Sequence, residues 1–253
     1  MKIAVLGSGG WGTALAMVLL ENGHDVTLWS YSEDESKVLR ETGENPMLKG
    51  VALPETLKLT SDMACVKGCG AVVLATPSFA VRETARKLAD LLEPETILIS
   101  VSKGIEKDTS LTLTQVIESE VGETVKIVAL SGPSHAEEVG RRVPTTVVAA
   151  SRDQAAAELV QDLFMNPRFR VYASDDVVGV ELAGALKNVI ALSAGVCDGM
   201  GFGDNTKAAL MTRGLSEIAR LGEALGGRKE TFAGLAGVGD LIVTCTSMHS
   251  RNR

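Results

Sequence analysis

Short apolar runs recur along the first half of the chain, and none of them alternates strictly between apolar and polar residues. The runs are Ile3–Leu6, Val26–Trp29, Ala71–Ala75, Ile97–Val101 and Val125–Leu130. Turn residues follow each run, and amphipathic segments of helix length separate most of them. Strands that are apolar on both faces are typical of a parallel sheet that helices cover on both sides. The pattern therefore predicts an α/β fold with a mostly parallel sheet.

The second half of the chain changes character after about Asp176. Before that point we expect a strand at Thr145–Ala149, a helix at Asp153–Phe164 and a further strand at Phe169–Tyr172. After it the pattern predicts long helices at Val177–Cys197, Asn205–Leu225 and Asp240–Ser247, joined by glycine-rich loops. We therefore expect an α/β domain at residues 1–176 and an all-helical domain at residues 177–253.

Composition limits the classes of partner. The 253 residues are 45% hydrophobic and 23% charged with a net charge of −7, as in ordinary globular proteins, and the acidic balance disfavours nucleic acid and membrane surfaces. We expect a small-molecule partner. The four cysteines form no CxxC pair and no regular spacing with the three histidines, which indicates no metal site and reduced, cytoplasmic thiols. The sequence contains no run of about 18 apolar residues, so it predicts no membrane span.

A glycine motif directly follows the first predicted strand. Gly7, Gly9 and Gly12 fit the pattern G-x-G-x-x-G, with Gly10 and Trp11 between them, and a helical run follows. The first glycine permits a tight turn, the second lets the backbone approach a pyrophosphate, and the third permits close helix–strand packing. A bare glycine-rich turn is the alternative, but the position within a βαβ rhythm favours a Rossmann-like, dinucleotide-binding domain.

The end of the second predicted strand bears on the choice of cofactor. In NAD-binding domains an acidic residue about 20 positions after the glycines binds the ribose 2′-hydroxyl. Here Tyr31 stands at that edge, Glu33 arrives late, and no arginine is placed to bind a 2′-phosphate. The cofactor is therefore NAD(P), with NADPH slightly favoured by the missing carboxylate. Tyr31 either stacks on the adenine or caps the sheet edge.

Polar loops follow three of the predicted strands. They are Thr76–Ser78, Ser102–Gly104 and Ser131–Ser134, and ligands in open parallel sheets bind at this edge. Lys103 is therefore expected to face the cofactor cleft rather than to be an ordinary solvated lysine. For His135 we expect a hydrogen-bonded structural role rather than that of a base.

Lys187 lies on a helical stripe of small residues. The positions three or four residues apart on its face are Val180, Ala183, Gly184, Ala191 and Ala194. Close packing of such a face would partly desolvate the ammonium and lower its pKa towards neutrality, as a general base requires. The alternative is a lysine whose stem covers alanines while its charge reaches solvent.

Three later segments carry further candidates. Residues 198–205 are rich in glycine, which indicates either a close backbone approach or a helix-ending turn. Asp240 stands at a predicted helix start, where it either caps the helix or joins a site. Arginine and asparagine donors in the last five residues suit a phosphate, unless they form a solvated tail.

Taken together, the sequence resembles the bacterial-type NAD(P)-dependent glycerol-3-phosphate dehydrogenases over essentially its whole length. The motifs that carry the resemblance are GSGGWGTALA at 7–16, SKG at 102–104, SGPSHAEE at 131–138, GALKNVIALSAGVCDGMGFGDN at 184–205, TRGLSEIARLG at 212–222, GLAGVGDLIVTCTS at 234–247 and SRNR at 250–253. The glycine motif is shared by many dehydrogenases. The Lys187 segment and the combination of GVGD with SRNR are far more specific.

The resemblance implies roles for individual residues. Lys187 would be the proton acceptor, with Lys103 and Asp240 completing the polar site. The substrate-binding positions would be Lys103, Gly132, Ser134, Lys187, Asp240, Ser250, Arg251 and Asn252. The cofactor-binding positions would be Gly7, Gly9, Gly10, Trp11, Gly12, Tyr31, Lys103, Ala136 and Arg251.

The implied reaction is reversible hydride transfer between NAD(P)H and dihydroxyacetone phosphate or sn-glycerol 3-phosphate, without a metal. In the family it supplies glycerophospholipid synthesis, and a cytoplasmic homodimer is a further expectation. Family members continue beyond SRNR, so we expect the helical domain to be truncated at Arg253. The competing interpretations are a 3-hydroxyacyl or 6-phosphogluconate-type dehydrogenase and a noncatalytic NAD(P) sensor.

Overall fold

The computed structural model describes residues 1–250 and 252, which contain an eight-stranded sheet in the order β3-β2-β1-β4-β5-β6-β7-β8. The strands are β1 (Lys2–Leu6), β2 (Asp25–Trp29), β3 (Lys58–Thr60), β4 (Ala71–Leu74), β5 (Ile97–Ser100), β6 (Ile127–Ser131), β7 (Thr145–Ala150) and β8 (Phe169–Ser174). Every neighbouring pair is parallel except β6 and β7. The predicted mostly parallel, Rossmann-like sheet is confirmed.

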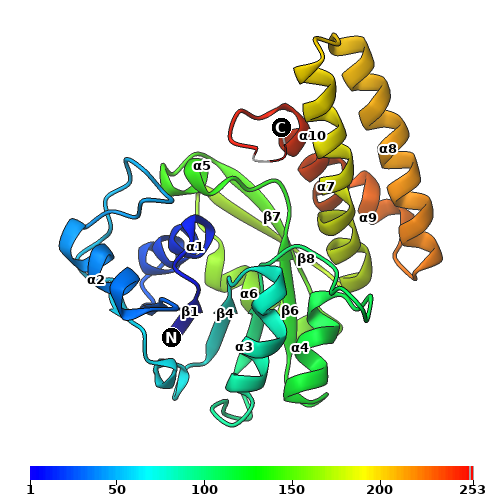
Figure 1. Ribbon diagram of the computed structural model, residues 1–253. Helices are drawn as coiled ribbons and strands as arrows, with labels where there is room; N and C mark the ends of the chain where they lie inside the picture. Colours follow the sequence, from blue (N-terminus) through cyan, green and yellow to red (C-terminus); the bar gives the residue numbers. More distant parts are fainter. Residues whose placement is uncertain (251, 253) are drawn as a thin grey trace.

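Helices cover both faces of this sheet (Figure 1). They are α1 (Gly10–Glu21), α2 (Glu33–Thr42), α3 (Val81–Leu88), α4 (Leu113–Val121), α5 (Ala136–Gly140) and α6 (Gln154–Phe164), with short 3₁₀ turns at Met63–Val66 and Ser78–Ala80. Successive residues of β1 show the two layers: Ile3 and Val5 belong to the core that α1 and α6 cover, and Ala4 and Leu6 to the core under α3 and α4. Burial on both faces explains why the strands read as continuous apolar runs.

Two features of the sheet differ from the sequence pattern. The three-residue strand β3 was not predicted, because its residues are only half-buried or exposed at the sheet edge and form no apolar run. The direction of β7 was not predicted either: it pairs antiparallel with β6, with Leu130 opposite Ala149. β8 then pairs parallel with β7, so the last two strands both run against the other six.

The remainder of the described chain is helical. Its elements are α7 (Val177–Gly199), α8 (Asp204–Ala224), α9 (Lys229–Ala233), a π-helical segment η3 (Leu235–Gly239) and α10 (Asp240–Thr246). The yellow and orange helices α7 and α8 in Figure 1 form a packed pair, joined by the glycine-rich turn. Val180, Phe232 and Ala236 pack with Ala150 of β7 in one shared apolar cluster. The helical part therefore packs directly against β7, the first of the two reversed strands.

Helix α7 is the one helix of the described residues that is long and apolar enough to cross a membrane by length and composition alone. Its most apolar 18-residue window has a mean hydropathy of 1.5, and 44% of that window is buried within the protein. The helix also buries Glu181 and Lys187 and contacts α8, α10 and β6. Core helices of globular proteins meet the same length criterion, and charged side chains are costly inside a membrane.

Candidate active site

In the glycine loop between β1 and α1, the space beside Gly9 is open, whereas backbone atoms lie close to Gly7 and Gly12. Gly7 has a φ of +122°, and a Cβ atom there would lie 2.6 Å from the Ala75 carbonyl oxygen. A Cβ on Gly12 would lie 2.0 Å from the Gly7 oxygen, whereas a Cβ on Gly9 would meet nothing nearer than the Met47 sulfur at 4.0 Å. Packing thus explains Gly7 and Gly12, and the open space above Gly9 suits the approach of a pyrophosphate.

The start of α1 supports the same interpretation. Gly9 is the N-cap residue, and no side chain caps the first backbone amides, which leaves them available to an anion. Trp11 packs against the apolar core, and Ala136 begins α5, which packs on α1. Tyr31 is 81% exposed at the end of β2 with its ring edge-on to Trp29. The residues present therefore fit a dinucleotide.

Buried hydroxyls without partners gather at the carboxyl edge of the sheet. Ser30 follows β2, Thr76 follows β4, and Ser131 ends β6. Within residues 1–250 and 252, the side-chain oxygens of all three are buried and accept or donate no hydrogen bond. Buried polar groups are normally satisfied, so these three hydroxyls are exceptions, and all of them lie at the carboxyl edge of the sheet.

Asp240 joins the two candidate lysines. The Lys103 ammonium lies 2.6 Å from its Oδ2, and the Lys187 ammonium donates to its Oδ1. The Asp240 side chain is 1% exposed, that of Lys187 7%, and that of Lys103 22%. Lys187 also donates to Thr244 Oγ1 at 2.7 Å, and Lys103 to the Gly132 oxygen at 3.0 Å. Three residues far apart in sequence thus form one buried cluster, open to solvent on the Lys103 side.

Local structure explains how Asp240 and Thr244 face this cluster. The π-helical segment η3 leads directly into α10, whose first residue is Asp240. The N-cap of α10 is Gly239, so Asp240 points into the site instead of capping the helix. Thr244 lies one turn later on the same face and donates to the Asp240 backbone oxygen at 2.7 Å.

Two contacts hold α7 in place, one against strand β6 and one against helix α4. A Cβ on Gly184 would lie 2.9 Å from Ser131 Oγ and 3.5 Å from the Lys103 side chain, so the missing side chain lets the helix approach closely. One turn earlier, the buried Glu181 carboxylate accepts hydrogen bonds from the Thr114 amide at 2.9 Å and the Thr114 hydroxyl at 2.5 Å. Burial raises the pKa of Glu181. The predicted stripe of small residues on α7 is buried, and Lys187 lies within it.

The pKa of the Lys187 amine is lowered to about 7, first by burial and then by the nearby Lys103 ammonium. The Asp240 carboxylate acts in the opposite direction but does not outweigh them. An amine with such a pKa gains and loses a proton near neutrality, which suits a general acid–base role.

Gly132, Ser134 and Asn252 are the remaining predicted substrate residues that the structure connects to the cluster or to its sequence neighbours. Gly132 has a φ of +141°, and its oxygen accepts a second hydrogen bond from Ser134 Oγ at 2.9 Å. Asn252 donates to Asn188 Oδ1 at 2.8 Å, next to Lys187 in the sequence. Ser250 lies at the end of a turn with its amide bonded to the Ser247 oxygen, and Arg251 lies outside the described residues.

Sequence reasoning missed Thr244 and Asn188 and misjudged His135. The signal for Thr244 was its four-residue spacing from Asp240, and that for Asn188 was its position beside Lys187. His135 was expected to be hydrogen-bonded, but its buried Nε2 has no partner in the described part of the chain, and its ring lies 5.9 Å from that of His249.

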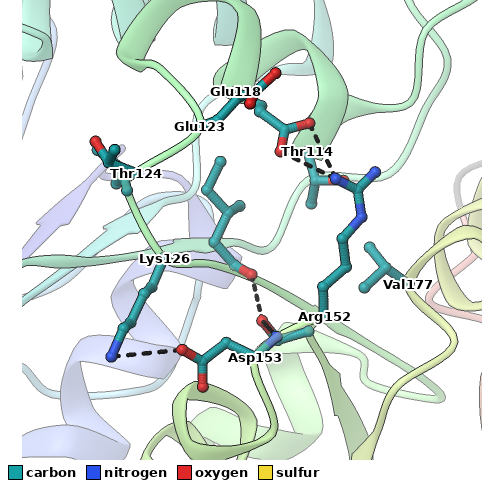
Figure 2. Close-up of a pocket in the computed structure, with 11 residues that line it drawn as sticks. Thr114, Glu118, Glu123, Thr124, Lys126, Arg152, Asp153 and Val177 are labelled. Atoms are coloured by element: carbon teal, nitrogen blue, oxygen red, sulfur yellow. Dashed lines mark hydrogen bonds and ion pairs between the residues drawn. The ribbon is translucent and has the colours of Figure 1, made fainter.

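A surface cavity of about 490 Å³ lies away from Lys103 and Lys187, where β6 begins and β7 ends (Figure 2). Arg152 pairs with Glu118 at 3.0 Å, and Lys126 pairs with Asp153 at 3.4 Å. These charges satisfy one another, and the length of β6 separates the cavity from Gly132. We do not assign the reaction to it.

The comparisons with known proteins show the family of this chain. The family models of the NAD-dependent glycerol-3-phosphate dehydrogenase N-terminus and C-terminus match residues 2–157 and 176–253. A glycerol-3-phosphate dehydrogenase [NAD(P)+] of Moorella thermoacetica is 58% identical over all of this chain and 75% of its own length, and that of Bacillus subtilis is 52% identical over 99% and 74%.

Solved structures show the same relationship. The glycerol-3-phosphate dehydrogenase of Coxiella burnetii matches with a TM-score of 0.95 and 42% identity, over 99% of this chain and 77% of that one. The enzyme of Saccharomyces cerevisiae matches with a TM-score of 0.85 and 31% identity, over 98% and 78%. The resemblance found in the sequence is confirmed, and the chain belongs to the NAD-dependent glycerol-3-phosphate dehydrogenase family.

Proposed function

We propose that the chain is an NAD(P)-dependent glycerol-3-phosphate dehydrogenase, which interconverts sn-glycerol 3-phosphate and dihydroxyacetone phosphate. One observation carries the proposal: the carboxylate of Asp240 holds Lys103 and Lys187 together on the ligand-binding edge of a sheet that begins with a dinucleotide-type glycine loop. Membership of the family supports the substrate and the reaction.

The glycine loop is the proposed binding site of the cofactor. NAD(P) supplies or accepts the hydride when it is bound. Gly9, Gly10 and the uncapped amides of α1 would hold its pyrophosphate, while Gly7 and Gly12 shape the turn. Trp11, Tyr31, Lys103, Ala136 and Arg251 complete the proposed set of cofactor-binding residues.

Lys187 is the proposed proton carrier. In the oxidation of glycerol 3-phosphate, its neutral amine accepts the proton of the C2 hydroxyl. In the reduction of dihydroxyacetone phosphate, its ammonium donates a proton to the oxygen at C2. Asp240 and Thr244 accept hydrogen bonds from this nitrogen and so fix its position.

The other polar groups would orient the three-carbon substrate. The Lys103 ammonium, partly open to solvent, can reach a substrate oxygen while it stays bonded to Asp240 and Gly132. Ser134, Ser250, Arg251 and Asn252 are the proposed partners of the substrate's remaining oxygens, the phosphate included. Binding the phosphate away from C2 restricts the orientations of the reacting carbon.

The test is a rate measurement with dihydroxyacetone phosphate, following the absorbance of the reduced cofactor. Lys187→Ala is expected to abolish turnover while cofactor binding, measured by fluorescence, survives. Lys187→Arg is expected to fail as well, since a guanidinium does not release its proton. Failure of the unmodified chain to reduce this substrate, or retained turnover in Lys187→Ala, contradicts the proposal.

We also propose how the product is used, where the enzyme is located and how many subunits it has. Glycerol 3-phosphate is a precursor of glycerophospholipids, so the reaction would supply lipid synthesis. We propose a cytoplasmic location, consistent with four cysteines that form no disulfide, and a homodimer. Cell fractionation and analytical ultracentrifugation check these two statements.

A further inference from the structure

The first turn of α2 places three carboxylates beside the end of β2. Glu33, Asp34 and Glu35 are all exposed, and Ser32 caps the helix by accepting a hydrogen bond from the Glu35 amide at 3.3 Å. The second strand of a Rossmann-type domain ends where the adenosine ribose of a dinucleotide binds. An acidic group is therefore present at this edge, although no acid stands at the strand end itself.

Only one of these carboxylates is seen to contact the glycine loop. Ser8 lies between the first two glycines of the motif, and its hydroxyl donates to Glu35 Oε2 at 3.3 Å. Glu33 is held elsewhere, by Arg40 at 2.6 Å and by the Ser61 hydroxyl at 2.7 Å, and these bonds lower its pKa. Glu35 thus accepts from a hydroxyl on the loop that would hold the cofactor, and this long, exposed bond is one that another hydroxyl can replace.

The basic residues of the adjacent helices are already paired with carboxylates. On α2, Lys37 pairs with Glu41 and Arg40 with Glu33. On α3, every basic side chain is bonded within ion pairs: Arg82 with Glu106 and Glu120, Arg86 with Glu120, and Lys87 with Glu83. A 2′-phosphate carries close to two negative charges and normally requires an arginine. On α2 and α3 no arginine is left without a carboxylate partner to bind such a phosphate.

We propose that Glu35 is a specificity-determining residue that makes this chain bind NADH more tightly than NADPH. Its carboxylate accepts a hydrogen bond from the ribose 2′-hydroxyl in place of Ser8 and repels a 2′-phosphate. This inference rests on the proposed use of the glycine loop for NAD(P). It replaces the slight preference for NADPH that the sequence favoured, because the acid arrives from α2 rather than from the end of β2.

The test is the binding of NADH and NADPH to the whole chain without substrate, followed by quenching of tryptophan fluorescence. Trp11 lies in the first turn of α1 and Trp29 ends β2, the two elements between which the cofactor is proposed to bind. The unmodified chain is expected to bind NADH at least about tenfold more tightly than NADPH. Glu35→Gln is expected to reduce that ratio about tenfold, chiefly through tighter binding of NADPH, because the amide keeps an acceptor but loses the charge.

Glu41→Gln is the matched control. It removes the same charge from the last turn of the same helix, where Glu41 pairs with Lys37 and not with Ser8. The ratio of the two dissociation constants should stay unchanged in this variant. Equal or tighter binding of NADPH by the unmodified chain overturns the inference, and so does an equal response of the two variants. Because no substrate is present, these results are separate from a failure to reduce dihydroxyacetone phosphate.

Discussion

Gly184 of α7 approaches Ser131 of β6 so closely that a Cβ atom on the glycine would lie 2.9 Å from the serine hydroxyl oxygen. The same approach places the helix against the stem of Lys103, 3.5 Å from that Cβ position. Lys187 follows one turn later on the same helix. The spacing between α7 and β6 therefore bears directly on the distance between the two lysines.

Gly184→Ala should lower turnover of dihydroxyacetone phosphate about tenfold, equivalent to about 1.4 kcal/mol in the activation free energy. The added methyl group displaces either α7 or Lys103, although alanine favours the helix itself by about 1 kcal/mol over glycine. Adding Ser131→Ala removes the clashing oxygen and should restore most of the rate. If the double variant is as slow as the single one, the contact is not the cause.

The pH dependence of glycerol 3-phosphate oxidation should follow the Lys187 amine. The neutral amine is the active form, so kcat/KM rises with pH through the lowered pKa of Lys187, about 7, and the reverse reaction falls through the same region. Asp240→Asn removes a group that raises this pKa and should move the rise to lower pH. Lys103→Met removes a group that lowers it and should move the rise to higher pH. Shifts of the same sign in both variants would contradict this account.

Substitution by alanine should have different effects at Gly9 and at Gly12 of the glycine loop. At Gly9 the methyl group meets only open space and φ is −64°, so the free energy of unfolding should fall by about 1 kcal/mol or less. The dissociation constant for NADH should rise at least about tenfold, because the methyl group occupies the proposed pyrophosphate site.

The companion change Gly12→Ala should destabilise the fold itself, since its methyl group would overlap the Gly7 oxygen at 2.0 Å. Thermal unfolding and fluorescence titration of both variants check the contrast. Normal NADH binding by Gly9→Ala would show that the cofactor does not approach this position.

Glu181 should make stability depend on pH. Burial raises its pKa above the unfolded value, so the folded chain binds more protons than the unfolded chain as pH rises from the unfolded pKa to the folded one. The free energy of unfolding of the unmodified chain, compared with that of Glu181→Gln, should therefore decrease across this window and stay lower above it. Urea unfolding of both proteins between pH 4 and pH 8 measures the difference, and a constant difference would contradict the prediction.

The sequence predicted the mostly parallel sheet and the candidate loops at its edge because both follow from local patterns. Strands buried on both faces appear as apolar runs, and strand ends appear as glycine or hydroxyl loops. The stripe of small residues around Lys187 left two roles open, a base or a lysine that reaches solvent, and the resemblance to the family favoured the base. The place of Asp240 between two lysines depends on residues 53 and 137 positions away.

Other features have no comparable local signal. The strand β3 gains its place from pairing with β2, and the direction of β7 is decided by its partners rather than by its own residues. The contact between Ser8 and Glu35 joins a loop to a helix 27 residues later, so the pattern at the end of β2 could not reveal it.

The reversed direction of β7 and β8 decides where α7 enters the molecule. Val177 lines the cavity beside Lys126, which precedes β6, and Gly184 reaches Ser131 at the far end of that strand. From Val177 to Lys187 the helix advances by ten residues, or about 15 Å, which is close to the length of β6. The helix therefore carries the Lys187 amine from the amino end of this strand to its carboxyl end. Inserting or deleting one residue before Lys187 would rotate its side chain by about 100° away from Asp240, so the length of this stretch is as constrained as its composition.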